Sequence, residues 1–140
     1  MTDLPLFRVL YCSHATVPME VPLNTAEILG AAARNNRRDG LTGVLAYADG
    51  IFIQVTEGPK TAVDALMKRL ESDRRHRDIV VLGSENTRER RFPEWIMETP
   101  RMRPDHTALL HRLVGQCESS YREALDMMIE LVREHEQRRA

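Results

Sequence analysis

Three polar side chains stand at positions that the strand or helix period assigns to an apolar face. Gln54 lies between isoleucine and valine in the run IFIQV, residues 51–55. Tyr11 shares a strand face with Phe7 and Val9 in FRVLYCS. Asn36 follows Leu29 and Ala32 at helical spacing in TAEILGAAARNNRRD, residues 25–39. A carboxamide that leaves water must find partners for its donors and its acceptor. The three side chains are therefore candidates for a polar site within an apolar layer.

Two inward-facing amides near a phenol favour one class of ligand. Because an amide both donates and accepts, the pair suits a planar heteroaromatic molecule with carbonyl and imide N–H groups along one edge. A flavin has such an edge. Trp95 and Met97 share one face of the last expected strand and add an indole and a thioether. Taken singly, each residue also has an ordinary interpretation as an edge residue, a helix cap or packing.

The hairpin that carries Gln54 is predicted by its turn. The Asp-Gly pair at 49–50 favours a two-residue turn, because both central positions prefer positive φ. In that register Gln54 lies opposite Leu45 and shares a sheet face with Tyr47 and Phe52. The other face is wholly apolar, with Val44, Ala46, Ile51, Ile53 and Val55. Both faces of the hairpin therefore need a cover.

Local signals place two helices beside the hairpin. Asn24 and Glu27 resemble a capping box that begins a helix, and Gly40 is suited to end it. Gly58-Pro59 precedes a second helix over residues 60–73, with apolar residues at helical spacing. Asn36 projects from the first helix on the face expected to meet the sheet.

The remaining strands complete an α+β order. One strand is predicted at 7–13, a buried strand at 78–82, and an edge strand at 92–97, because Pro93 cannot donate a ladder hydrogen bond. The order β-α-β-β-α-β-β is the ferredoxin-like plan, with both helices on one face of the sheet.

Two further helices are expected near the C-terminus, around 106–114 and from about 119 to 136. The longer one has an apolar stripe of Tyr121, Leu125, Met128, Ile129 and Val132. This stripe is suited to cover the second face of the sheet. Packing against a second copy of the chain, to form a homodimer, is the alternative.

Composition limits the class of protein. The chain has 140 residues, 20 Lys+Arg and 21 Asp+Glu, for a net charge of −1. This balance disfavours nucleic acid and anionic membranes as partners, and no run suits a signal peptide or a membrane span, so we expect a cytoplasmic protein. Cys12 and Cys117 show no zinc or disulfide spacing, and the five histidines show no metal-ligand spacing. No metal site is predicted.

Five segments together resemble one family. VLYCSHAT, ARNNRRDGLTGVLAY, GIFIQVTEGP, DRRHRDIVVL and RRFPEWIM are similar, in order, to segments of the BLUF family of blue-light sensors that use flavin. The resemblance covers roughly residues 6–98, and the short chain resembles stand-alone members. It implies a flavin-binding domain over 1–98 that holds FAD between its two helices, with 99–140 as a helical extension.

The resemblance also implies roles for individual residues. Tyr11 matches the photoactive tyrosine and Gln54 the glutamine that changes hydrogen-bond partners. Asn36 matches the asparagine that binds the C4=O and N3–H edge of the flavin, and Arg75 a basic residue near the C2 carbonyl. Asn35 is a further expected contact, at a position where some relatives have histidine. The other expected contacts are Phe52 near Gln54, Arg38 near the pyrophosphate, and Trp95 and Met97 on the last strand.

The implied function is that of a photoreceptor that signals to a downstream protein and is not itself an enzyme. Two alternatives remain open at this point. A small FAD-dependent redox enzyme would need an acid/base group or a nicotinamide site, and no GxGxxG motif is present. A flavin-free ferredoxin-like binding module would bind an acyl phosphate through its arginines. A purified protein that is colourless and takes up no flavin would support this last alternative.

Overall fold

The computed structural model describes residues 5–16, 36, 38–74, 76–92, 95–96, 102–114 and 121–139. For residues 95–96, 114 and 138–139 it describes the main chain alone. The strands are β1 Leu6–Ala15, β2 Thr42–Ala48, β3 Ile51–Pro59, β4 His76–Thr87 and β5 Trp95–Ile96. The helices are α2 Lys60–Glu71, α3 Pro104–Val114 and α4 Tyr121–Arg139. Most of the expected first helix lies outside the described residues.

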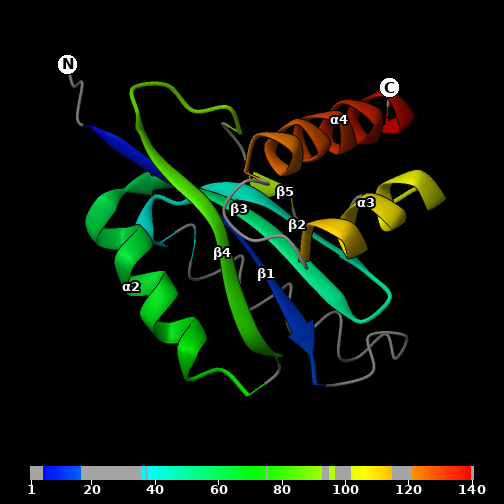
Figure 1. The fold of residues 1–140 in the computed structure, drawn as a ribbon. Coiled ribbons are helices and arrows are strands. Elements are labelled where there is room, and N and C mark those ends of the chain that lie inside the picture. Colours follow the sequence, from blue (N-terminus) through cyan, green and yellow to red (C-terminus); the bar gives the residue numbers. More distant parts are fainter. Residues whose placement is uncertain are drawn as a thin grey trace.

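The five strands form one mixed sheet in the order β4-β1-β3-β2-β5 (Figure 1). All neighbours are antiparallel except β2 and β5, which are parallel. β5 lies at an edge, as the sequence predicts. The hairpin is confirmed as well, because Asp49 and Gly50 have φ values of 50° and 79° and Leu45 pairs with Gln54.

The end of the first helix is described and follows the prediction. Asn36 is helical, and its carbonyl accepts the N–H of Leu41 at 2.9 Å. Gly40 between them has a φ of 72°, the left-handed conformation that glycine adopts without a steric penalty. This bond across a left-handed glycine is the Schellman closure of a helix. It holds Asn36 directly before β2.

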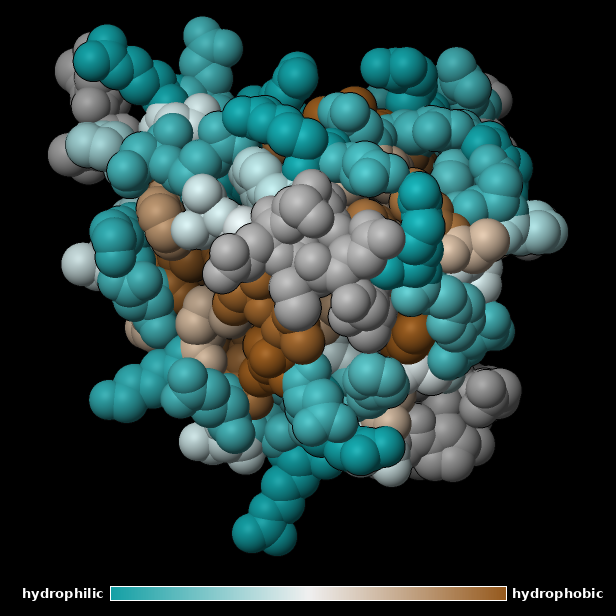
Figure 2. All heavy atoms as spheres, in the orientation of Figure 1, coloured by the Kyte–Doolittle hydropathy of each residue, from teal (hydrophilic) through white to brown (hydrophobic). Residues whose placement is uncertain are grey.

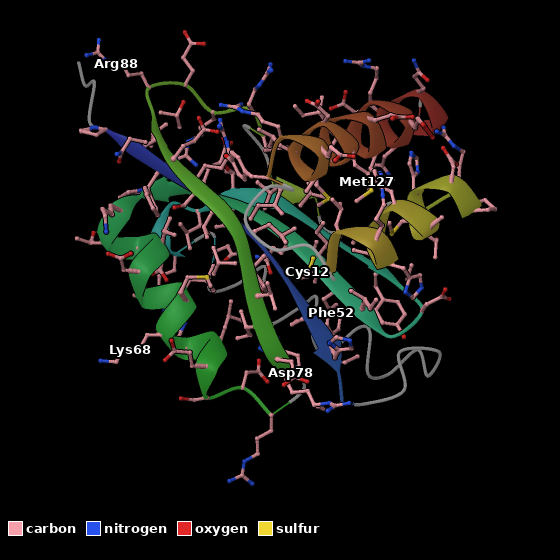
Figure 3. All side chains as sticks on the ribbon, viewed as in Figure 1. Cys12, Phe52, Lys68, Asp78, Arg88 and Met127 are labelled. Atoms are coloured by element: carbon pink, nitrogen blue, oxygen red, sulfur yellow. The ribbon has the colours of Figure 1, made fainter. Side chains whose placement is uncertain are left out.

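Helices cover both faces of the sheet (Figure 1). On the α2 side, Val63 and Leu66 pack with Val9 of β1 and Leu41. The larger apolar cluster lies on the other side, where α3 and α4 meet the face predicted to need a cover. Figure 3 shows Cys12 and Met127 within this second layer, while Lys68 of α2 is directed away from the sheet. The predicted cover by the C-terminal helices is confirmed.

The strand predicted at 78–82 is confirmed as part of β4, but the prediction that it is buried was wrong. β4 lies at the edge opposite β5, so only one strand flanks it, and its residues alternate in exposure. Leu82 is buried, but Val81 is 44% exposed. In Figure 2, apolar atoms lie just below the grey atoms at the centre of the view, among largely hydrophilic surroundings. A short apolar run does not reveal whether a strand is central or at an edge, since that depends on pairing.

A glycine on β4 lets α4 begin close to the sheet. A Cβ added at Gly83 would lie 2.5 Å from Cγ of Tyr121, the first residue of α4. The Tyr121 hydroxyl donates a hydrogen bond to Glu85 on the same strand. The ring therefore lies across the strand at the one place where β4 has no side chain on that face.

We expect Gly83→Ala to destabilise the protein by about 1–3 kcal/mol, because the new methyl group forces the Tyr121 ring off the strand. Urea unfolding measures the loss. Ser84→Ala, at the exposed neighbouring position, serves as the control and should leave stability nearly unchanged. Equal stability of the two variants would contradict the packing described above.

Candidate functional site

The phenol and the glutamine singled out in the sequence meet in the centre of the sheet. Tyr11 on β1 and Gln54 on β3 are directly paired residues, so their side chains lie on one face. The Tyr11 hydroxyl donates to Gln54 Oε1 at 2.5 Å. Both side chains are buried, with exposed fractions of 2% and 5%. The pairing of two strands thus produces a buried bond between groups 43 residues apart.

The other end of the Gln54 carboxamide is also bonded. Nε2 donates to Thr56 Oγ1 at 2.8 Å, and Thr56 is buried on the same face, two residues along β3. Sequence reasoning did not identify Thr56. The available signal was the two-residue period of a strand, which places residues 54 and 56 side by side.

The carboxamide of Asn36 is buried without a partner among the described residues. Its side chain is almost wholly buried, and neither Nδ2 nor Oδ1 makes a hydrogen bond there. A buried donor and acceptor left unpaired cost about 1–3 kcal/mol each. Such a pair is completed by a ligand that offers an acceptor beside a donor.

The structure places some of the other predicted residues and leaves several outside its description. Phe52 is buried two residues before Gln54, with its ring centre 5.3 Å from that of Tyr47. The Arg38 side chain is 64% exposed and bonds Asp39. The main chain of Trp95 pairs with Gly43 in the sheet, but its side chain is not described. Asn35, Arg75 and Met97 lie outside the described residues.

Comparison with known proteins identifies the family. Residues 6–98 match the sequence profile described as "BLUF: Sensors of blue-light using FAD". The chain belongs to the BLUF family. The resemblance seen in the sequence is thereby confirmed, and FAD is the cofactor that this family uses.

Several light-regulated proteins are similar to this chain in sequence or in fold. The photoactivated adenylate cyclase subunit beta of Euglena gracilis is 38% identical over 96 residues, or 68% of this chain and 11% of that protein. The chain thus spans about a tenth of the length of the curated relatives it matches. The dark-state structure of the BLUF protein BlrB has a TM-score of 0.72 at 28% identity, covering 94% of this chain and 97% of that one. A bacterial light-regulated adenylyl cyclase has a TM-score of 0.66 at 30% identity, covering 79% and 36%. The expected α+β ferredoxin-like fold is confirmed.

The described residues fit the flavin that BLUF domains use. The unpaired amide of Asn36 supplies one donor and one acceptor, which is what the C4=O and N3–H edge of an isoalloxazine ring requires. This fit rests on the buried, unsatisfied atoms and is independent of the family match.

A second buried polar cluster, absent from the sequence predictions, lies on the opposite face of the BLUF sheet. Glu57 is 0% exposed and its Oε2 accepts from Arg8 Nε at 2.7 Å. The same carboxylate accepts the main-chain N–H groups of Arg91 at 3.0 Å and Phe92 at 2.7 Å. Arg8 also donates to Glu85 at 3.0 Å. The cluster therefore ties β1, β3 and β4 to the chain segment that leads into β5.

A histidine-carboxylate group also emerges in the fold, although no metal spacing is present in the sequence. Ligand atoms of His106, Glu130 and Glu134 lie within 4.8 Å of one another. The guanidinium of Arg103 donates to both carboxylates, so a positive charge already occupies the group. These bonds, together with His106, keep the pKa of the Glu130 carboxyl below its usual value. We interpret the group as a contact between α3 and α4.

The burial of Tyr11 determines how the site responds to alkali. Desolvation raises the pKa of its phenol above the ordinary value of 10.0, and the negative charge of Asp73 adds to the effect. Because the folded pKa is raised, the neutral phenol stabilises the fold fully below about pH 10, and this contribution is lost as pH rises further.

We therefore expect Tyr11 to remain protonated in the folded protein at pH values where a free tyrosine ionises. As the pH is raised, wild type and Tyr11→Phe should develop the same phenolate absorbance until the protein unfolds. Circular dichroism, measured in parallel, reports the pH of unfolding. An extra phenolate in folded wild type with a midpoint near the ordinary pKa would contradict the burial.

The buried ion pair predicts strong coupling between its two partners. Arg8→Met or Glu57→Leu should each cost about 3–5 kcal/mol, because either change leaves an unpaired charge in the core. The double variant should lose clearly less than the sum, as measured by denaturant unfolding in a double-mutant cycle. Strictly additive losses would show that the pair does not act as a unit.

Proposed function

We propose that this chain is a blue-light photoreceptor in which illumination changes the hydrogen-bond partners of Gln54. The observation that carries the proposal is the buried 2.5 Å bond from the Tyr11 hydroxyl to Gln54 Oε1. A phenol is an electron and proton donor, and among the described residues this one bonds a buried proton acceptor, Gln54 Oε1. No acid/base pair for work on a second substrate was found in the sequence.

Several residues would hold the flavin. Asn36 supplies the unpaired amide, and Tyr11, Gln54 and Phe52 lie on the sheet face toward α2. Asn35, Arg38, Arg75 and Met97 remain proposed contacts, together with Trp95. When bound, a flavin supplies the absorption of blue light and, in its excited state, a strong one-electron acceptor.

The chain's own residues then handle the proton. Loss of an electron makes a phenol strongly acidic, so the Tyr11 proton moves along its existing bond to Gln54 Oε1. When the electron returns, Gln54 gives one proton back to Tyr11. Return of the proton from oxygen leaves a rotated amide, and return of one from nitrogen leaves the tautomer. The electron and the proton both come back, so no substrate is consumed. The amide now presents a different donor to its surroundings, which we expect to shift the chromophore's absorption slightly to the red.

The energies involved suit a switch between two states. One amide hydrogen bond contributes about 1 kcal/mol net, and an unsatisfied buried alternative costs up to ~3 kcal/mol. Differences of this size shift populations between two conformations without unfolding a domain.

We propose that residues 1–98 receive the light and that residues 99–140 carry the output to a downstream protein. Support comes from the family match over 6–98 and from the packing of α3 and α4 on the sheet. Glu57, three residues from Gln54 on β3, holds the segment entering β5. The proposal assigns no catalysis, nucleic acid or membrane to this chain, and contact between two copies through α4 is the alternative output.

Among the described helices, none has the length and hydrophobicity that a membrane span requires. We place the protein in the cytoplasm, where Cys12 stays a buried free thiol.

Light-minus-dark absorption spectra test the proposal. Wild type should be yellow and show a reversible red shift, while Tyr11→Phe and Gln54→Leu should keep flavin and lose the shift. Tyr47→Phe, on the same sheet face, is the matched control and should retain it. A full shift in either site variant would remove that residue from the switch, and a colourless protein that binds no flavin would overturn the proposal.

A further inference from the structure

Thr56 has an unusual position for a hydroxyl group. It is 0% exposed, in the middle of β3, with Val9 of β1 and Gly43 of β2 as its paired residues. Neither neighbour offers a polar side chain. Within the described part of the chain, the hydroxyl makes one hydrogen bond, which it accepts from Gln54 Nε2 at 2.8 Å.

The Thr56 hydroxyl can both donate and accept a hydrogen bond. It carries one rotatable donor and two acceptor sites. In the structure described, it accepts from the amide nitrogen. If the Gln54 carboxamide turns over, its oxygen faces Thr56, and the same hydroxyl can then donate to it. Thr56 can thus satisfy either orientation of the amide without moving its own backbone.

We propose that Thr56 is a positioning residue that holds the Gln54 carboxamide in both of its orientations and thereby sets how long the light-induced state lasts. This inference rests on the proposed function. Its physical basis is that the hydrogen bond between Thr56 and the Gln54 carboxamide stabilises both orientations of the amide. This bond is broken while the amide rotates from one orientation to the other. Removing the hydroxyl therefore raises the energy of both end states and lowers the barrier between them.

Dark recovery after illumination is the first test. Thr56→Val, which has nearly the same shape, should still show a red shift but recover roughly 5- to 30-fold faster than wild type, the factor that one lost hydrogen bond provides. Thr56→Ser keeps the hydroxyl and should recover at close to the wild-type rate. Thr42→Val makes the same chemical change at a threonine whose hydroxyl bonds Arg90 and should leave recovery unchanged.

A second measurement needs no light. In nuclear magnetic resonance spectra of the dark protein, the Gln54 side-chain NH2 signal, assigned by its absence in Gln54→Leu, should move upfield in Thr56→Val and stay near its wild-type position in Thr56→Ser. This signal reports the bond itself and is unaffected by the photochemistry.

The outcomes separate the two proposals. A wild-type protein without a reversible red shift in absorption would contradict both the proposed function and this inference. A normal shift in wild type with unchanged recovery in Thr56→Val would overturn the inference alone, as would an unmoved Gln54 signal. Faster recovery in the valine variant, restored by serine, would establish the role of Thr56.

Discussion

Burial of one carboxamide is the constraint on which the rest of the structure depends. Gln54 lies on a strand flanked on both sides, so water does not solvate its amide and its partners must be protein groups or a ligand. Tyr11 and Thr56 supply those partners at 2.5 Å and 2.8 Å. Because a carboxamide has distinct donor and acceptor ends, turning it over exchanges the group that faces Tyr11 with the group that faces Thr56. Each of the two hydroxyls then has to change between donating and accepting.

The sheet separates two buried layers that differ in their polar groups. On one face lie Tyr11, Gln54 and the helix α2. On the other face lie α3 and α4 over the larger apolar cluster, together with the buried pair of Arg8 and Glu57. Strand β3 contributes to both layers because its side chains alternate. A single strand thus connects the Tyr11–Gln54 pair with the segment that leads into β5.

Much of the fold could be predicted because its signals are local. The Asp49-Gly50 turn determined the hairpin register, and Gly40 marked the end of the first helix. The burial of 78–82 was predicted wrongly, since an apolar run carries no information about which strands flank it. The polar partners Thr56 and Glu57 were missed for a related reason. Their neighbours become visible only when strands pair, and in sequence both look like ordinary strand residues.

The sequence by itself determined the family, the hairpin, the amphipathic helices and the identity of the polar residues at apolar positions. These features depend on turn chemistry, strand and helix periodicity and short motifs, all of which act over a few residues. Tertiary structure alone decided that Tyr11 meets Gln54 and that Arg8 meets Glu57, pairs separated by 43 and 49 residues. Such contacts require the register between β1 and β3, and that register is set by packing both faces of the whole sheet at once.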